Sequence, residues 1–91
     1  MNSRTSPLKT LGENAKKLRL ANQWTQEVAA VKGGFSYKHY QSLETGKLGG
    51  VTYSTIERLS ALFNVEVWQL FHPAAFPKPK IQKISPRKIR R

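Results

Sequence analysis

The stretch TQEVAAVKGGFSYKHYQSLETG, residues 25 to 46, decides the fold of this 91-residue chain. Its first residue, a threonine, can cap a short helix over residues 26 to 32. Gly33-Gly34 ends that helix, because glycine accepts the left-handed conformation that a sharp turn needs. Ser36 then caps a helix over residues 37 to 45, which a glycine closes. The stretch therefore predicts two short helices joined by a tight turn.

The second of these helices has a polar outer side. At about 100° per residue, Tyr40 and Leu43 define its inward side. The positions that point most directly away from it hold hydrogen-bonding groups and no acid: they are Lys38, Gln41, Ser42 and Thr45, flanked by Tyr37 and His39. A DNA major groove admits an α-helix, so such a helix can offer side chains to base edges. The alternative is a solvated face without a ligand.

Three more helices are predicted around this pair. Ser6-Pro7 starts a helix over residues 7 to 21, with an apolar stripe at three- and four-residue spacing. Thr52 caps a fourth helix that stops at Asn64, and a last short helix covers residues 67 to 71. The expected fold is all-α, a compact bundle of five helices.

The sequence also predicts which residues face the interior. In the 26 to 32 helix we expect Val28, Ala29 and Ala30 to point inward, and in the fourth helix we place Tyr53 on the apolar side with Ile56, Leu59, Leu62 and Phe63. Ala29 and Gly33 are small, so we expect the ring of Tyr40 to fill the space beside them.

The charge of the chain is strongly basic and unevenly placed. Sixteen Lys and Arg against five Asp and Glu give a net charge of +11, which favours nucleic acid or an acidic membrane surface as partner. Residues 72 to 91 hold seven of the basic residues and no acid. We expect a disordered N-terminus over 1–6, one helical domain over 7–72, and a basic, proline-containing, largely disordered tail over 73–91.

Several classes of protein are disfavoured by composition. There is no cysteine and only two histidines, so we expect no disulfide, no metal site and no cofactor. No acid–base or nucleophile constellation is evident, so we expect no catalytic residues and no enzyme. No signal-peptide core is present and no segment approaches the roughly 18 apolar residues of a membrane helix. We expect a soluble, cytoplasmic, nucleoid-associated protein.

A spaced set of residues runs through most of the predicted helices. The set comprises Leu18-Arg19, Thr25-Gln26-Glu27, Ala30, Gly34, Ser36, Leu43, Glu44-Thr45-Gly46-Lys47, Thr55-Ile56 and Asn64-Val65. In type and spacing it resembles the lambda-repressor-like (Xre-type) helix-turn-helix family. The resemblance implies a five-helix bundle that binds double-stranded DNA as a homodimer on a two-fold related site, with the 37 to 45 helix in the major groove.

The resemblance also suggests roles for individual residues. It implies that Ser36, Tyr37, Lys38 and Ser42 contact bases. We add Gln41 as a fifth candidate, because its side-chain amide can both donate and accept a hydrogen bond. For phosphate contacts, we expect Thr25, Gln26, Thr45 and Lys47. Arg19 and Glu44 match a buried structural ion pair. In the tail, Arg87, Lys88, Arg90 and Arg91 can follow the DNA backbone or enter a minor groove.

Two functions remain open. The first is a sequence-specific, repressor-like regulator of transcription. The alternative is a protein-interaction module, an antitoxin-like or bridging protein with a second protein partner, for which DNA binding is secondary. Trp68 and Phe71 on the last helix are candidates for a homodimer contact. The sequence also departs from the family pattern, because Val28 lacks the carboxylate of a capping box and Gly49-Gly50 lengthens the next loop.

Overall fold

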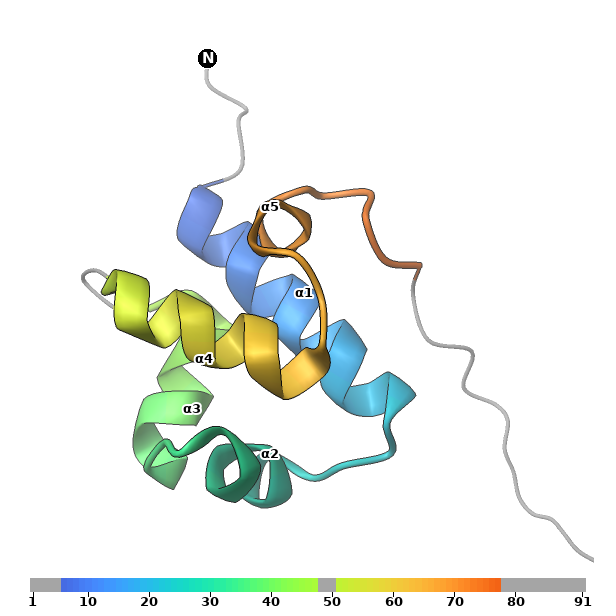
Figure 1. Ribbon diagram of the computed structural model, residues 1–91. Helices are drawn as coiled ribbons and strands as arrows, with labels where there is room; N and C mark the ends of the chain where they lie inside the picture. The colour runs from blue at the N-terminus through green and yellow to red at the C-terminus, as the bar shows by residue number, and fades with distance from the viewer. Residues whose placement is uncertain (1–5, 48–50, 78–91) are drawn as a thin grey trace, which may run out of the picture.

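The computed structural model describes residues 6–47 and 51–77, and these residues form five α-helices and no strand (Figure 1). The helices are α1 (Pro7–Ala21), α2 (Gln26–Gly33), α3 (Tyr37–Thr45), α4 (Tyr53–Phe63) and α5 (Val67–Leu70). The all-α, five-helix prediction is confirmed. Most of the N-terminus and tail predicted to be disordered, 1–6 and 73–91, lies outside the described residues, as does the Gly49-Gly50 loop; residues 6 and 73–77 of these segments are described.

Side-chain caps start four of the helices as predicted. The hydroxyl oxygens of Ser6, Thr25, Ser36 and Thr52 each accept a hydrogen bond from a backbone N–H in the first turn that follows, at 3.1 to 3.2 Å. Gly34, Gly46 and Asn64 end α2, α3 and α4 in the left-handed conformation, at φ 77°, 71° and 56°. Two ends differ by one residue: α2 includes Gly33, and α5 stops at Leu70.

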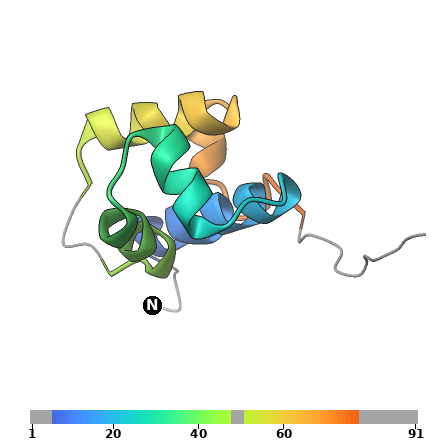
Figure 2. The ribbon, with the colours of Figure 1, turned by 90° about the horizontal axis from the view of Figure 1, so that it is seen from below.

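Helix α1 is the longest of the described helices, and α3, α4 and α5 pack against it. It makes its most extensive contact with α3 and also touches α4 and α5, while α2 packs on α3 and α4. Helices α2 and α5 lie at opposite ends of the bundle (Figure 1), and Figure 2 shows the α2–α3 end from below. The buried apolar side chains are Leu11, Ala15, Ala29, Ala30, Phe35, Tyr40, Leu43, Leu59, Phe63 and Leu70.

A glycine lets α1 approach the last turn of α3. A Cβ added to Gly12 would lie 2.3 Å from the carbonyl oxygen of Leu43 and 2.7 Å from that of Glu44. Both neighbours are backbone atoms, so they cannot move aside as a flexible side chain would. The absence of a side chain at Gly12 therefore determines how closely α3 packs against α1.

A buried amide ties α1 to α5. Asn14 is almost fully buried, and its Nδ2 donates to the carbonyl oxygens of Gln69 (3.2 Å), Leu70 (2.8 Å) and His72 (3.0 Å). The carbonyls of Gln69 and His72 also accept the backbone N–H groups of His72 and Ala75, both at 3.2 Å, whereas that of Leu70 is one of the carbonyls that a helix end leaves without a backbone partner. Farther along α1, Lys17 Nζ donates to the carbonyl oxygen of Phe76 at 3.2 Å. Helix α1 thus fixes α5 and the chain that leaves it.

Two predictions about the interior are wrong. Val28 is 39% exposed and Tyr53 is 65% exposed. Three consecutive residues of a helix span about 200°, so Val28 cannot share the inward side of α2 with Ala29 and Ala30. At 3.6 residues per turn, the side chain of Tyr53 points about 100° away from the mean direction of the buried Leu59 and Phe63 around α4.

The space beside Gly33 is filled by a different ring from the one expected. A Cβ on Gly33 would lie 2.6 Å from Phe35 Cε2 and 3.1 Å from Leu62 Cδ2. Tyr40 is fully buried, and its ring centroid is 6.1 Å from that of Phe35. Phe35 therefore occupies the space beside Gly33, and Tyr40 packs behind it.

Candidate nucleic-acid interface

The turn between α2 and α3 is held from several sides. Gly34 adopts φ 77°, and the backbone N–H of Phe35 donates to the carbonyl oxygen of Ala30 at 2.8 Å. Arg58 of α4 donates from Nη1 to the carbonyl oxygen of Gly34 at 3.2 Å, and its guanidinium lies 5.8 Å from the centroid of the Phe35 ring. The turn therefore gives α3 a defined start relative to α2.

The residues predicted to contact bases lie on α3 and at its cap. Ser36, Tyr37 and Lys38 are exposed, whereas Gln41 and Ser42 are half-buried. Ser36 Oγ accepts the backbone N–H of His39 at 3.1 Å, so this hydroxyl caps the helix. Tyr40 and Leu43 are buried beneath them.

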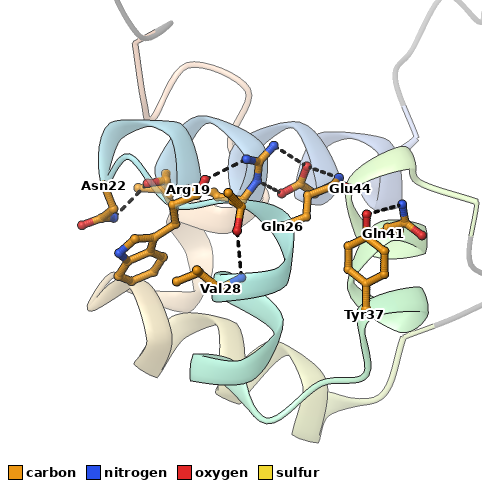
Figure 3. A network of polar contacts seen from close by, with 10 residues as sticks. Arg19, Asn22, Gln26, Val28, Tyr37, Gln41 and Glu44 are labelled. Carbon is orange, nitrogen blue, oxygen red and sulfur yellow. Dashed lines mark hydrogen bonds and ion pairs between the residues drawn. The ribbon is translucent and has the colours of Figure 1, made fainter.

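Two of these side chains are joined on the surface of α3. Gln41 Nε2 donates to the hydroxyl oxygen of Tyr37 at 3.1 Å, one helical turn away (Figure 3). Since the tyrosine oxygen accepts this hydrogen bond, its own proton stays available for an outside acceptor. The amide of Gln41 keeps one N–H donor and its carbonyl oxygen. The pair thus presents two donors and an acceptor.

A buried network joins α1, α2 and α3 behind this face. Arg19 Nε lies 2.6 Å from Glu44 Oε2, and Arg19 Nη2 donates to Glu44 Oε1 at 3.1 Å. Arg19 Nη1 also donates to the carbonyl oxygen of Trp24 at 2.9 Å, just before α2. Gln26 Nε2 completes the network by donating to Glu44 Oε1 at 3.0 Å (Figure 3). The ion pair suggested by the resemblance is present in the structure.

The electrostatics of α3 favour an anion. Glu44 is the only acid in the helix, and its side chain is 3% exposed and paired with Arg19. The hydrogen bond to Glu44 raises the pKa of the Arg19 guanidinium, against the lowering effect of burial. Among the described residues, the charges exposed on α3 and just after it are those of Lys38 and Lys47.

The residues predicted to contact phosphates lie at two helix ends. Thr25 and Gln26 begin α2; the Thr25 hydroxyl caps the helix, and the Gln26 amide is bonded to Glu44. At the other end of the segment, Thr45 is exposed and its Oγ1 donates to the carbonyl oxygen of Ser42 at 3.0 Å. The Lys47 side chain is exposed. Arg87, Lys88, Arg90 and Arg91 lie outside the described residues.

The fold and this segment match a known family. A model of the helix-turn-helix family matches residues 16–67, which span the chain from the middle of α1 to the start of α5. The chain belongs to the lambda-repressor-like (Xre) helix-turn-helix family. This is a family of DNA-binding regulators, not of enzymes.

Two solved structures resemble the chain over most of its length. A hypothetical transcription factor, NHTF, from Neisseria has a TM-score of 0.70 at 25% identity, covering 76% of this chain and 78% of that one. The restriction-modification controller protein C.AhdI from Aeromonas hydrophila has a TM-score of 0.65 at 26% identity, covering 70% and 96% respectively. The comparison with curated proteins gives no match.

The sequence did not reveal the long-range contacts of two polar residues, one at the turn between α2 and α3 and one between α1 and α5. Arg58 holds the turn from a position 24 residues away, and Asn14 reaches carbonyls more than 50 residues away. Neither has a local signal, because each partner is defined only by the packing of distant segments. Within residues 6–47 and 51–77, no group of three or more His, Cys, Asp or Glu could hold a metal ion. In the same ranges, no helix has both the length and the apolar character to cross a bilayer.

Proposed function

We propose that the protein is a sequence-specific, double-stranded DNA-binding regulator of transcription, with α3 in the major groove. The observation that carries this proposal is the outer side of α3, where hydrogen-bonding side chains and Lys38 reach the surface and the one acid of the helix is paired. Membership of a family of DNA-binding regulators supports it. So does the likeness to proteins described as a transcription factor and a controller protein.

The side chains of α3 match the groups on base edges. Lys38 can donate to O6 and N7 of guanine, and Gln41 can both donate to a base and accept from it. The hydroxyls of Tyr37 and Ser42 can bond to bases or to nearby phosphates. Sequence preference then comes from these contacts, whereas most of the affinity comes from phosphates.

We further propose that two copies bind a two-fold related site. Such a site needs a self-complementary contact between the copies. Trp68 on α5 is the candidate, because it is 62% exposed at the end of the bundle opposite α2. Trp68→Ser should leave the fold intact, shift the chain to a monomer in sedimentation, and weaken binding to a two-half-site DNA.

The basic tail is proposed to add affinity without sequence preference. Each phosphate neutralised on duplex DNA changes the slope of log K against log salt by about −0.9, through counterion release. Deletion of residues 78–91, which lie outside the described ranges, should lower affinity for all sequences alike and make that slope shallower. An unchanged slope after the deletion would exclude the tail from the DNA.

Selection from a random double-stranded DNA library tests the main proposal. The full chain is expected to enrich one motif, and to bind it more tightly than a scrambled version throughout a salt titration. If both sequences bind alike and lose affinity together as salt rises, the protein is a non-specific binder. If neither binds, the proposal of a DNA-binding function fails.

A second candidate function is a protein-interaction module. The observation that favours it is apolar surface on α2, where Val31 is 80% exposed close to the exposed Val28. Copurification from the native cell separates the two functions. An unrelated protein retained in stoichiometric amount favours the interaction module, and recovery with DNA alone favours the regulator.

A further inference from the structure

We propose that Glu44 positions Gln26 for its contact with a DNA phosphate. In this arrangement Arg19 holds the Glu44 carboxylate, and the carboxylate in turn holds the side-chain amide of Gln26 at the start of α2. The inference rests on the proposed function, because it concerns how this protein meets the DNA backbone. It assigns the ion pair a role beyond joining α1 to α3.

The carboxylate of Glu44 is fixed at both oxygens. Oε2 accepts from Arg19 Nε at 2.6 Å, and Oε1 accepts from Arg19 Nη2 at 3.1 Å. A two-point contact with a planar guanidinium sets the orientation of the carboxylate plane as well as its position. The same guanidinium is anchored by the carbonyl oxygen of Trp24 at 2.9 Å, so the network also fixes the chain that enters α2.

Gln26 is bonded to this fixed carboxylate through one of its two amide protons. Its Nε2 donates to Glu44 Oε1 at 3.0 Å, whereas the side chain as a whole is half-buried and reaches the surface. The second N–H remains as a donor for an oxygen of a phosphate. Without Glu44 the side chain would be free to rotate, and DNA binding would have to order it at an entropic cost.

Arg19 has a second effect, because it compensates the charge of Glu44. An unpaired carboxylate bonded to Gln26 would repel a phosphate that approaches the same amide. The ion pair therefore lets an acidic residue orient a phosphate-binding side chain. This explains why a carboxylate can stand directly behind a surface that is proposed to meet DNA.

A double-mutant cycle tests the inference. Arg19→Met with Glu44→Leu replaces the whole ion pair by apolar side chains, a change that other proteins often tolerate. Gln26→Ala is measured by fluorescence anisotropy on the selected DNA, in the wild-type chain and in this double variant. We expect Gln26→Ala to weaken binding about 10- to 100-fold in the wild-type chain, the worth of one charge-assisted hydrogen bond, and less than about twofold in the double variant. Equal losses in the two backgrounds would overturn the inference.

A second measurement needs no variant of the ion pair. In the free wild-type chain, the side-chain amide protons of Gln26 should exchange with water about tenfold more slowly than those of the exposed Gln23, because one of them is bonded to Glu44. Disappearance of the signals in Gln26→Ala assigns them. Equal exchange rates for the two glutamines would overturn the inference, even if the double variant fails to fold. Failure of the wild-type chain to bind any DNA would instead remove the proposed function.

Discussion

We predict that the side-chain amide of Asn14 contributes strongly to the stability of the fold. Its amide donates to three carbonyl oxygens at and beyond the end of α5. Asn14→Ala leaves the buried carbonyl of Leu70 without this partner, while those of Gln69 and His72 keep backbone donors, so we expect the free energy of unfolding to fall by about 1 to 3 kcal/mol. Urea unfolding at neutral pH measures the loss.

Asn22 gives a matched control for that change. Its amide also donates to a backbone carbonyl, that of Leu18 at 2.9 Å, but the residue is exposed. Asn22→Ala should cost less than about 0.5 kcal/mol, because water replaces the lost partner. Similar losses for the two variants would show that Asn14 does not act as a buried cap.

Tyr40 predicts a specific dependence of stability on pH. Its hydroxyl is buried and has no hydrogen-bond partner among the described residues. Burial raises the pKa of this hydroxyl above its ordinary value of 10.0, and the nearby Glu44 raises it further. The unfolded chain therefore loses the proton at a lower pH than the folded chain does. The free energy of unfolding therefore does not depend on this hydroxyl below pH 10. Above pH 10 it falls by about 1.4 kcal/mol per pH unit, as long as the tyrosine is ionised only in the unfolded chain.

Comparison with Tyr40→Phe isolates this contribution. At pH 8 the variant should be as stable as the wild-type chain or up to about 1 kcal/mol more stable, because a buried hydroxyl without a partner is removed. Above pH 10 the advantage of the variant should grow. Tyr53→Phe, on the surface, serves as the control. Parallel pH curves for the wild-type chain and Tyr40→Phe would contradict the assignment.

The contact between α1 and α3 depends on the absence of a side chain at Gly12. Alanine is a better helix former than glycine by about 1 kcal/mol, so Gly12→Ala would stabilise an open helix surface. Here the added Cβ would meet the backbone of α3 at 2.3 Å, and we expect a net loss of about 1 to 3 kcal/mol. Thermal or urea unfolding gives the sign directly, and a gain in stability would disprove the close contact.

Gly34→Ala is the matched control for this helix contact. Gly34 has φ 77° and no atom within 4 Å of a Cβ added there. Its substitution should cost about 1 to 2 kcal/mol through the left-handed conformation alone. Gly12→Ala should weaken DNA binding per folded molecule more than Gly34→Ala does, because it moves α3 away from α1.

The helices could be predicted from the sequence because their ends are local. Ser6, Thr25, Ser36 and Thr52 cap the backbone within three residues, and the left-handed stops are set by glycine or asparagine. The inward sides of α2 and α4 were predicted less well, since an apolar residue need not be buried. Val28 and Tyr53 are exposed for that reason.

The site could be predicted in part. The outer residues of α3 follow from helical periodicity, and the pairing of Arg19 with Glu44 follows from the family resemblance. The bond between Gln26 and Glu44 and the support from Arg58 could not be predicted. Both depend on where three packed helices place their side chains, which is not a local property of the sequence.

The molecule as a whole combines a neutralised interior with a basic exterior. Glu44 is paired inside, whereas Lys38 and Lys47 are exposed, and the chain carries a net charge of +11. Non-specific attraction to DNA is expected from this charge alone. Affinity by itself therefore cannot establish that α3 recognises a sequence, and the ratio of affinities for two sequences is the informative quantity.

The most direct test of groove recognition by α3 compares Lys38→Ala with Lys16→Ala. Both changes remove one exposed lysine, from α3 and from α1 respectively, so they alter the net charge equally. Binding to the selected DNA and to its scrambled version is measured at one salt concentration. Loss of a base contact from Lys38 should lower the ratio of the two affinities about tenfold, whereas Lys16→Ala should leave the ratio unchanged. If Lys38→Ala weakens binding to both sequences equally, α3 does not recognise bases through this residue, and the central proposal is contradicted.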